Sequence, residues 1–474
     1  MPVPSPEFID ETRPPPACPE IAPDVGPWPR AAPGAAGLPR AVRAGEGELG
    51  YLEQRFAEPS PSGARAAELG PPARLKFLGA HLFDLLQKVA YEGGSTEDAR
   101  RRLICAALNA AAARGAPVLR IWGTLKRTGT SAELARAADA LELVLDENAR
   151  RARPLRFVIV LLNHQAGYGS PRPQLSLDDQ DPSSPWHASQ IYRGGSWRRE
   201  GAGLLGERIA VYRSRPKIQR SADILVWELV NELDTYRSVA GGSFSGPEAE
   251  ALRETFITPA VTLLAESFPQ PIAVGDLRGV IGKQAYLAFA RSIVAGLPEA
   301  IRGRLVWTSH AYVTAPADRS DDRAPSMASK RAGAQAGSEA LLREWARATA
   351  KLDVDLAFAA EAGLPFFVGE IGQQVKGIPA RFCADGPRHD IEALLRTVLE
   401  PTPEGPQRAA IEAAIFWGEG ECHLEVRDGE RTRIVQIGAG GDSADLGPNE
   451  TRARAEVQAA RRRARFRVAL PTSR

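Results

Sequence analysis

The sequence predicts a (β/α)8 barrel, and three observations support this fold class. Eight short apolar runs recur along the 474 residues, segments rich in alanine, leucine and arginine separate most of them, and no GxGxxG turn follows the first run. Strands that alternate with helices favour a parallel sheet covered by helices. An open doubly wound sheet would more often carry a glycine-rich phosphate turn after its first strand. We therefore favour the closed barrel.

The apolar runs are short and continuous, as strands buried on both faces are. The third run is followed by an insertion, residues 165–221, which is rich in glycine, proline and serine and has a helix expected near 204–215. The other expected helices cover about 96–114, 131–150, 247–267, 283–300, 337–363 and 388–399. The runs are LKFLGAHLF (75–83), PVLRIWG (117–123), LRFVIVLLNH (155–164), DILVWELVNE (223–232), PIAVGD (271–276), RLVWTSHAY (304–312), PFFVGEIG (365–372) and AAIFWGEGE (413–421).

Two terminal regions flank the barrel, which we expect to span residues 41–423. Residues 1–40 contain twelve prolines and are expected to form an extended arm. At the start of the barrel region we expect a strand or hairpin near Val42 to Phe56, followed by a loop. Residues 424–474 are expected to form a C-terminal extension, a hairpin with an Asp-Gly turn and then an arginine-rich, solvent-exposed helix.

The composition restricts the partners of the chain. A net charge of +2 gives no electrostatic reason to expect nucleic acid or an anionic membrane. No apolar run reaches the roughly 18 residues of a membrane span. The N-terminus has neither a basic start nor an apolar core, so no conventional secretory signal is recognised and the sequence points to the cytoplasm. Four widely spaced cysteines are expected to be reduced, with one disulfide as the alternative for an exported protein.

Polar and aromatic residues gather where the eight runs end. Three of the six histidines of the chain are among them. Barrel enzymes keep their catalytic groups at the carboxyl ends of the strands, so these residues predict a polar pocket with aromatic walls. The candidates are His81, Arg120, Trp122, Asn163, His164, Asn231, Glu232, Asp276, His310, Tyr312, Glu370, Trp417 and Glu419.

Glu232 and Glu370 are the central pair, because they end the fourth and seventh runs and so lie on opposite sides of a barrel mouth. Two carboxyl groups about 5 to 5.5 Å apart would suit a retaining glycosidase, one as acid/base and one as nucleophile. Arg120 and a hydrogen bond from Tyr312 would lower the pKa of the nucleophile. Glu228 lies in the middle of its run, where a paired or layer-filling role is more natural.

Several candidates suit contacts with a sugar. Asn231 would lie beside a sugar hydroxyl, where hydrogen bonds strengthen in the transition state. Trp122 and Trp417 would offer flat apolar faces to sugar rings, although both could instead be barrel packing. His164 and His310 fit substrate contact and structural support equally well.

Structural roles remain open for the other candidates. Glu232 could cap the helix that follows it, and Glu370 could form a purely structural pair with Arg120. His81 is expected to be a hydrogen-bonded core or rim histidine, and Asp276 a loop or helix-start residue. No HxH, HExxH or GxSxG pattern is present, so we expect no metal site, no serine nucleophile and no cofactor.

The motifs resemble glycoside hydrolase family 5 of clan A, in particular its endo-β-mannanase branch. WELVNE (227–232) is similar to the acid/base strand, and PFFVGEIG (365–372) is similar to the nucleophile strand. Two departures are Leu233, in place of the usual proline, and AVGDLRG (273–279), where that branch more often has a Gly-Glu run. The resemblance covers residues 75–421, and its other motifs are VLRIWG (118–123), VLLNHQAGYG (160–169), SHAY (309–312) and AIFWGEG (414–420).

The resemblance implies a retaining β-glycoside hydrolase that acts on a β-mannan or related β-glycan, with Glu232 as acid/base and Glu370 as nucleophile. A β-glucanase, a cellulase, an exo-β-glycosidase and a non-catalytic carbohydrate-binding barrel are the alternatives. We expect a monomer whose partner is an oligo- or polysaccharide, and such a substrate favours export despite the lack of a signal. The implied substrate contacts and supporting residues are Arg120, Trp122, Asn163, His164, Asn231, His310, Tyr312 and Trp417.

Overall fold

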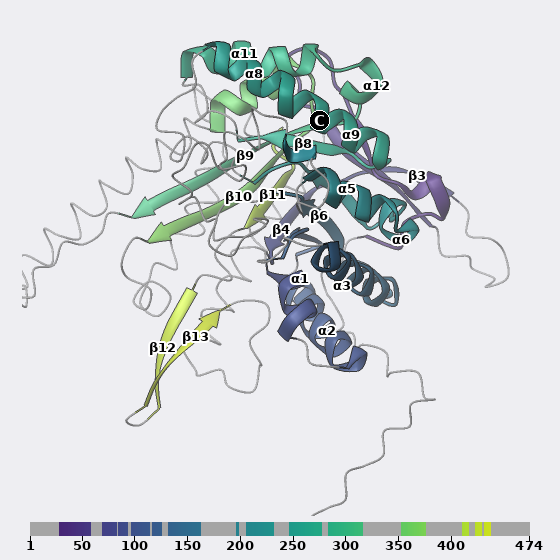
Figure 1. Cartoon of the computed structure of the whole chain (residues 1–474), viewed down its shortest axis with the longest axis vertical. Helices are drawn as coiled ribbons and strands as arrows, with labels where there is room; N and C mark the ends of the chain where they lie inside the picture. Colours follow the sequence, from purple (N-terminus) through teal and green to yellow (C-terminus); the bar gives the residue numbers. More distant parts are fainter. Residues whose placement is uncertain are drawn as a thin grey trace, which may run out of the picture.

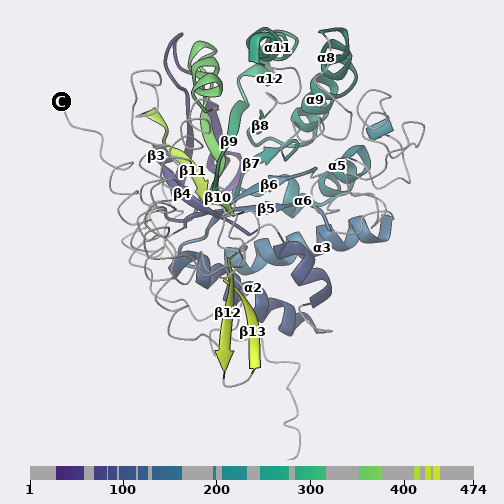
Figure 2. The ribbon, with the colours of Figure 1, turned by 90° about the vertical axis from the view of Figure 1, so that its left-hand side faces the viewer.

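Eight parallel strands close into a barrel in the computed structural model (Figures 1 and 2), so the predicted fold class is confirmed. The sheet order is β4-β5-β6-β7-β8-β9-β10-β11, and β11 pairs with β4 to complete the ring. The structure describes residues 28–57, 69–82, 84–92, 96–113, 116–125, 131–162, 196–198, 205–231, 246–276, 283–315, 352–375, 410–416, 422–428 and 431–437.

Each of the eight predicted apolar runs coincides with one strand of the barrel, and the sixth and seventh strands continue three residues beyond their runs, to Ala315 and Val375. Side chains on both faces of these strands are buried wherever the structure describes them, which explains why the runs are continuously apolar rather than alternating. The strands are β4 (Phe77–His81), β5 (Val118–Trp122), β6 (Arg156–Val160), β7 (Ile224–Glu228), β8 (Ile272–Gly275), β9 (Leu305–Ala315), β10 (Phe366–Val375) and β11 (Ala413–Phe416).

Helices lie outside the strands (Figure 2). In α3, for example, the buried side chains recur every three or four residues, which gives the helix one apolar face toward the barrel. The helices are η1 (Gly34–Gly37), α1 (Leu85–Gln87), η2 (Lys88–Glu92), α2 (Glu97–Ala113), α3 (Ser131–Ala149), η4 (Ser196–Arg198), α5 (Leu205–Arg213), α6 (Pro216–Gln219), α8 (Gly246–Leu252), η6 (Arg253–Ile257), α9 (Thr258–Ser267), α11 (Lys283–Ala295), α12 (Glu299–Arg302) and a helix over residues 352–361.

Most of the expected helices are confirmed. Those near 96–114, 131–150 and 204–215 correspond to α2, α3 and α5. The helix expected over 247–267 is divided into α8, the π-helical turn η6 and α9. The helix expected at 388–399 lies outside the described residues.

The buried apolar side chains form two clusters, which we name by their position relative to the strands. The outer cluster lies between the strands and the helices and includes Ile121, Ile159 and Trp227. The inner cluster lies within the barrel and includes Val118 and Val226. Because successive side chains of a strand point to opposite faces, membership of a cluster tells which neighbouring residues point inward.

A three-stranded antiparallel sheet packs against the amino ends of the barrel strands. It consists of β1 (Arg40–Val42), β2 (Tyr51–Ala57) and β3 (Leu69–Arg74), in that order. Leu52 and Phe56 of β2 belong to the inner cluster of the barrel. Trp28 meets Phe77, the first residue of β4, edge to face at 6.1 Å between ring centroids. These contacts close the amino end of the barrel.

The expected strand near Val42 to Phe56 is confirmed, but the loop expected after it is wrong in part. Residues 69–74 form β3, which pairs with β2. The sequence of β3, LGPPAR, contains Pro71 and Pro72, which argue against a central strand. β3 lies at the edge of its sheet, where proline is tolerated because one side of the strand makes no ladder.

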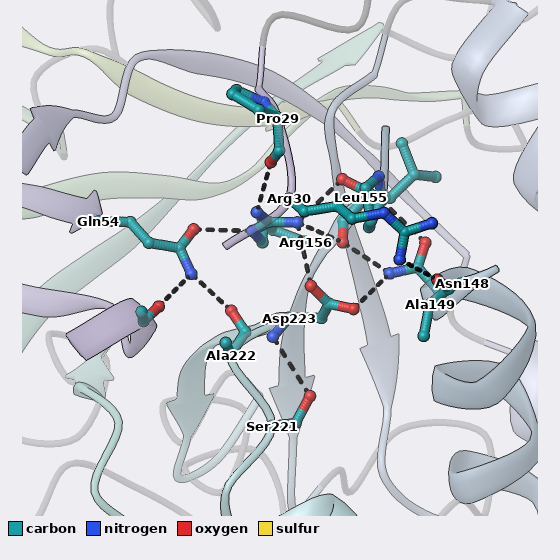
Figure 3. Close-up of polar contacts among 12 residues, drawn as sticks. Pro29, Arg30, Gln54, Asn148, Ala149, Leu155, Arg156, Ser221, Ala222 and Asp223 are labelled. Atoms are coloured by element: carbon teal, nitrogen blue, oxygen red, sulfur yellow. Dashed lines mark hydrogen bonds and ion pairs between the residues drawn. The ribbon is translucent and has the colours of Figure 1, made fainter. Parts of the chain in front are cut away.

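A buried arginine ties this sheet to the barrel (Figure 3). Arg156, the first residue of β6, donates from Nε to Oε1 of Gln54 on β2 at 2.7 Å. Its Nη1 donates to Oδ1 of Asp223 at 3.1 Å, and its Nη2 donates to the carbonyl of Pro29 at 3.1 Å. The Nδ2 group of Asn148 donates to the other oxygen of Asp223 at 2.9 Å. These five residues form the amino-end arginine network.

Beyond the barrel, β12 (Cys422–Asp428) and β13 (Arg431–Ile437) pair antiparallel, which confirms the expected C-terminal hairpin.

Cys105 is disulfide-bonded, so the expectation of reduced cysteines is wrong for this residue. Spacing along the chain could not reveal this, because a disulfide depends on which residues meet in space. None of the helices in the described ranges has the length and hydropathy needed to cross a bilayer.

Candidate active site

The guanidinium of Arg120 is the centre of a buried polar cluster at the carboxyl ends of the strands. Arg120 lies on β5 and is 0% exposed. Val118, two residues earlier on the same strand, belongs to the inner cluster, so Arg120 also points into the barrel. A guanidinium carries five N–H donors and cannot give up its charge, so burial requires several acceptors around it.

Two carboxylates and one amide oxygen supply these acceptors. Glu228, the last residue of β7, accepts from Nε of Arg120 at 2.8 Å and from Nη2 at 2.5 Å. Nη1 donates to Oε1 of Glu370 on β10, and Nη2 also donates to Oδ1 of Asn231 at 2.7 Å. We name these four residues the carboxyl-end arginine network.

The network keeps Arg120 charged. Burial alone lowers the pKa of Arg120, but the negative charges of Glu228 and Glu370 more than offset this effect and raise that pKa above its ordinary value. The guanidinium is therefore a fixed positive charge beside both carboxylates at every physiological pH.

An irregularity in β10 turns Glu370 toward Arg120. Phe367 belongs to the inner cluster, so simple alternation would point Glu370 outward. The register between β10 and β9 shifts between Val368 and Glu370, and Ile371 belongs to the outer cluster. A bulge of this kind re-aims the side chains that follow it. Glu370 thus points into the barrel because of the bulge.

Gly369 gives this bulge the space it needs. A Cβ atom on Gly369 would lie 2.7 Å from Oγ1 of Thr308 and 2.9 Å from Nε2 of His310. Both distances are shorter than van der Waals contact, so a side chain here would displace the His310 ring. The glycine lets His310 lie directly against the strand that carries Glu370.

Two histidines flank Glu370. Nδ1 of His310 lies 3.5 Å from Oε2 of Glu370 and 3.5 Å from Oδ2 of Asp276. Nδ1 of His81 lies 3.4 Å from Oε1 of Glu370, and its Nε2 lies 3.4 Å from Nη1 of Arg120. Burial and the nearby charges of Arg120 and His310 hold the pKa of His81 well below its ordinary value. A neutral His81 ring can accept a hydrogen bond from Arg120.

Asp276 reaches the cluster from a left-handed backbone conformation. It follows β8 directly, has φ of 53°, and its N–H donates to the carbonyl of Thr308 at 3.2 Å. We expected a loop or helix-start residue here, which describes its backbone but not its side chain. The buried carboxylate lies beside His310, and aspartate is among the residues that tolerate this conformation.

The structure brings together six of the candidate residues, namely His81, Arg120, Asn231, Asp276, His310 and Glu370. Of these, His81 was expected to be a hydrogen-bonded core or rim histidine, and its ring is buried beside Arg120 and Glu370. Trp122 is 3% exposed, and its ring meets the His81 ring edge-on at 5.8 Å between centroids. This position fits barrel packing better than a sugar platform.

The remaining predicted site residues lie outside the described part of the chain. Glu232 directly follows Asn231, but its side chain is not among those described. The backbone of Tyr312 pairs with Gly372 in the β9–β10 register, and its side chain also lies outside. The placement of the acid/base against the nucleophile therefore stays a prediction. Also outside are Asn163, His164, Trp417 and Glu419.

Glu228 is the residue that sequence reasoning left out of the site. Its expected paired role is confirmed, but its partner is the central arginine of the cluster. The sequence held one signal, a glutamate within a strand buried on both faces, which calls for a charged or polar partner. The residue that it meets depends on barrel closure, which the strand pattern does not encode.

The arrangement suits covalent chemistry at a carboxylate. Glu370 is held by a fixed cation, is almost fully buried and lies at the end of the barrel where catalytic groups gather. Within the described residues, no group of three or more histidine, cysteine, aspartate or glutamate side chains is arranged to hold a metal ion.

No protein-family model and no curated protein matches this chain. Solved structures similar to it include an endo-β-1,4-mannanase from Thermotoga petrophila, with 16% identity over 82% of this chain and 77% of that chain and a TM-score of 0.45. A GH5_18 variant from Streptomyces cattleya in complex with Manβ1-4GlcNAc matches with 16% identity, 84% and 83% coverage and a TM-score of 0.47. The catalytic domain of alkaline cellulase K matches with 14% identity, 91% and 96% coverage and a TM-score of 0.43.

Proposed function

We propose that this protein is a retaining β-glycoside hydrolase that cleaves a β-mannan or a related β-glycan. The observation that carries the proposal is the Glu370 carboxylate, which is buried at the barrel mouth and bound by the same guanidinium that orients Asn231. The nucleophile of a retaining glycosidase must be ionised and fixed in position. The adjacent charge of Arg120 favours the ionised form, and its hydrogen bond limits the motion of the carboxylate.

The reaction proceeds in two displacements. An oxygen of Glu370 attacks the anomeric carbon, the bond from that carbon to the leaving oxygen breaks, and Glu232 protonates the leaving oxygen. Glu232 then takes a proton from water, whose oxygen attacks the anomeric carbon and releases Glu370 as a carboxylate. Asn231, oriented by Arg120, contacts the sugar hydroxyl next to the anomeric carbon.

The preference for a β-mannan rests on the motifs WELVNE (227–232) and SHAY (309–312), which resemble the endo-mannanase branch. Leu233 and Asp276 are the positions where the chain departs from that branch. Because these departures weaken the substrate assignment more than the chemistry, the same chemistry with another β-glycan is the second candidate.

The test is release of reducing sugar from mannan, glucomannan, cellulose, mixed-linkage β-glucan and xylan by the wild type and by Glu370→Gln. We expect the wild type to act on mannan or glucomannan and the variant to lose about a thousandfold or more of that activity. The length profile of the products separates endo from exo action. Circular dichroism confirms that both proteins are folded.

Asp223→Asn is the matched control, because it removes a carboxylate from a buried arginine at the opposite end of the barrel. It should retain wild-type activity per folded molecule. Equal activity of the wild type and Glu370→Gln would eliminate Glu370 as the nucleophile. Binding of a polymer without any release would support the non-catalytic carbohydrate-binding barrel instead.

A further inference from the structure

We propose that Glu228 is a positioning residue that keeps Arg120 neutralised while Glu370 carries the sugar as an ester. The inference rests on the proposed function, because it concerns the covalent glycosyl-enzyme of that reaction. It goes further by giving a role in the reaction cycle to a carboxylate that makes no bond to the sugar.

The two carboxylates use different donors of the same guanidinium. Glu228 accepts hydrogen bonds from Nε at 2.8 Å and from Nη2 at 2.5 Å, whereas Glu370 accepts one from Nη1. They therefore bind Arg120 simultaneously and do not compete for one N–H group. Two parallel N–H···O bonds also fix the plane of the guanidinium, which sets the direction in which Nη1 meets Glu370.

Arg120 is the charge near Glu370 that does not change with pH. Among the described residues, the other ionisable groups that face Glu370 are His81 from β4 and His310 from β9, with Asp276 of the β8 end behind His310. The side chains of Arg120 and Glu228 are 0% and 1% exposed, so water contributes little to the solvation of either charge. The charge balance inside this site is therefore set by the protein's own groups.

The first displacement alters that balance. An oxygen of Glu370 forms a bond to the anomeric carbon, the leaving oxygen departs with the electron pair of the broken bond, and the carboxylate becomes a neutral ester. Arg120 then loses the negative charge of one of its two partners while it stays buried. A buried cation without a counter-charge is strongly unfavourable. Glu228 keeps its charge in both displacements and stabilises the ester state.

Replacement of Glu228 by glutamine preserves the shape of the side chain and removes its charge. Arg120 would then depend on Glu370 alone, which stabilises the ionised carboxylate relative to the ester. Formation of the ester should be slower, and its hydrolysis, which restores the carboxylate, should be faster. A residue that only shaped the site would slow both steps when changed, so opposite effects on the two steps identify the role in charge balance.

The test measures the two steps separately with dinitrophenyl β-mannobioside and β-cellobioside in which fluorine replaces the hydroxyl beside the anomeric carbon. The fluorine slows both steps, and the activated leaving group lets the ester accumulate. Intact-protein mass spectrometry follows ester formation, and the return of activity after removal of the probe follows hydrolysis. For Glu228→Gln we expect formation about tenfold slower and reactivation about tenfold faster than for the wild type, the rate equivalent of one pKa unit of charge interaction.

Two further variants complete the test. Glu228→Asp keeps the charge at a longer distance, so both of its rates should lie between those of the wild type and Glu228→Gln. Asp223→Asn, in the amino-end arginine network, should leave both rates unchanged. Should Glu228→Gln fail to fold, the reactivation rate of Glu228→Asp tests the inference instead. A rate faster than that of the wild type supports it, and an equal or slower rate overturns it.

The outcomes separate the two proposals. Labelling of Glu370 in the wild type, with reactivation of Glu228→Gln unchanged or slower, overturns the inference and leaves the proposed function intact. No ester on Glu370 of the wild type with either probe overturns the proposed function itself.

Discussion

Two buried arginines at opposite ends of the barrel meet the same physical requirement with different partners. Arg120 at the carboxyl end and Arg156 at the amino end are both 0% exposed. Arg120 donates to two carboxylates and an amide oxygen, whereas Arg156 donates to one carboxylate, the amide oxygen of Gln54 and the carbonyls of Pro29 and Pro154. Mostly neutral acceptors are thus enough to satisfy a buried guanidinium.

The difference shows in the pKa values of the two arginines. Burial lowers the pKa of Arg156, and the single carboxylate of Asp223 only partly opposes this effect. The two carboxylates around Arg120 outweigh burial and raise its pKa. Burial of an arginine therefore does not mark the candidate active site. The candidate active site is marked instead by the excess of negative charge around its buried arginine, because only one of the two ends of the barrel has to supply a reactive carboxylate.

The largest expected difference between the two ends comes from replacing each arginine with lysine. Lysine offers a single point charge in place of a planar fork of donors. Arg120→Lys cannot hold Glu228, Asn231 and Glu370 at once, and the resulting misplacement should lower kcat/KM about a hundredfold or more. Arg156→Lys should leave kcat/KM of the folded protein unchanged and lower the free energy of unfolding by about 3 kcal/mol.

Polymer hydrolysis and urea denaturation of both variants measure these effects. The urea transitions also show whether each variant is folded under the assay conditions, so that kcat/KM is compared between folded proteins. Equal losses of kcat/KM in Arg120→Lys and Arg156→Lys would show that the two networks do not differ in kind.

A smaller difference between the two ends is expected when one glycine at each end is replaced with alanine. Gly369→Ala should push the His310 ring away from Glu370 and lower kcat/KM about tenfold, as a displacement of less than 1 Å in the site would. A Cβ atom on Gly50, before β2, would lie 2.4 Å from the carbonyl oxygen of Val42, so Gly50→Ala should reduce the free energy of unfolding instead. Steady-state kinetics and thermal melts distinguish the two. A purely thermal effect of Gly369→Ala would contradict the role given to this glycine.

The smallest expected effect concerns the pH dependence of stability. The pKa of His81 is lower in the folded protein than its ordinary value of 6.5, so the unfolded chain binds more protons below that pH. His81 therefore contributes a loss of stability, at most about 1.4 kcal/mol per pH unit, as the pH falls below 6.5. His81→Asn should flatten the decline in the free energy of unfolding between pH 6.5 and about 5.

Asp223 at the amino end should have the opposite effect on how stability changes with pH. Burial raises its pKa above 3.8 in the folded protein, so the folded state binds more protons just above that pH and gains stability from this group as the pH falls. Asp223→Asn removes that gain and should steepen the decline toward acid pH. Urea denaturation at several pH values checks both variants, and changes of the same sign would contradict the comparison.

Local pattern along the chain predicted much of the fold. Each of the eight apolar runs coincides with a barrel strand, because strands buried on both faces need a continuous apolar sequence wherever the chain enters the core. The positions of Arg120, Asn231 and Glu370 toward the ends of their apolar runs then place them at one mouth, since parallel strands end on the same side. These conclusions depend only on the order of residues in the chain and on general rules for parallel strands.

Barrel closure decided the contacts between those residues. The pairing of Glu228 with Arg120 joins β7 to β5, strands separated by β6 in the ring, and it depends on the stagger of the strands. The inward direction of Glu370 depends on the bulge at Gly369. The approach of Asp276 to His310 depends on a left-handed backbone.

The sequence by itself thus determined the eight strands, their order along the chain and the residues that reach the mouth, because hydrophobic periodicity and position on a strand are local properties. Only the tertiary structure decided which carboxylate shares the charge of Arg120, because that choice depends on distances across a closed barrel. Electrostatic energy changes steeply with such distances in a buried site, and no local pattern encodes them.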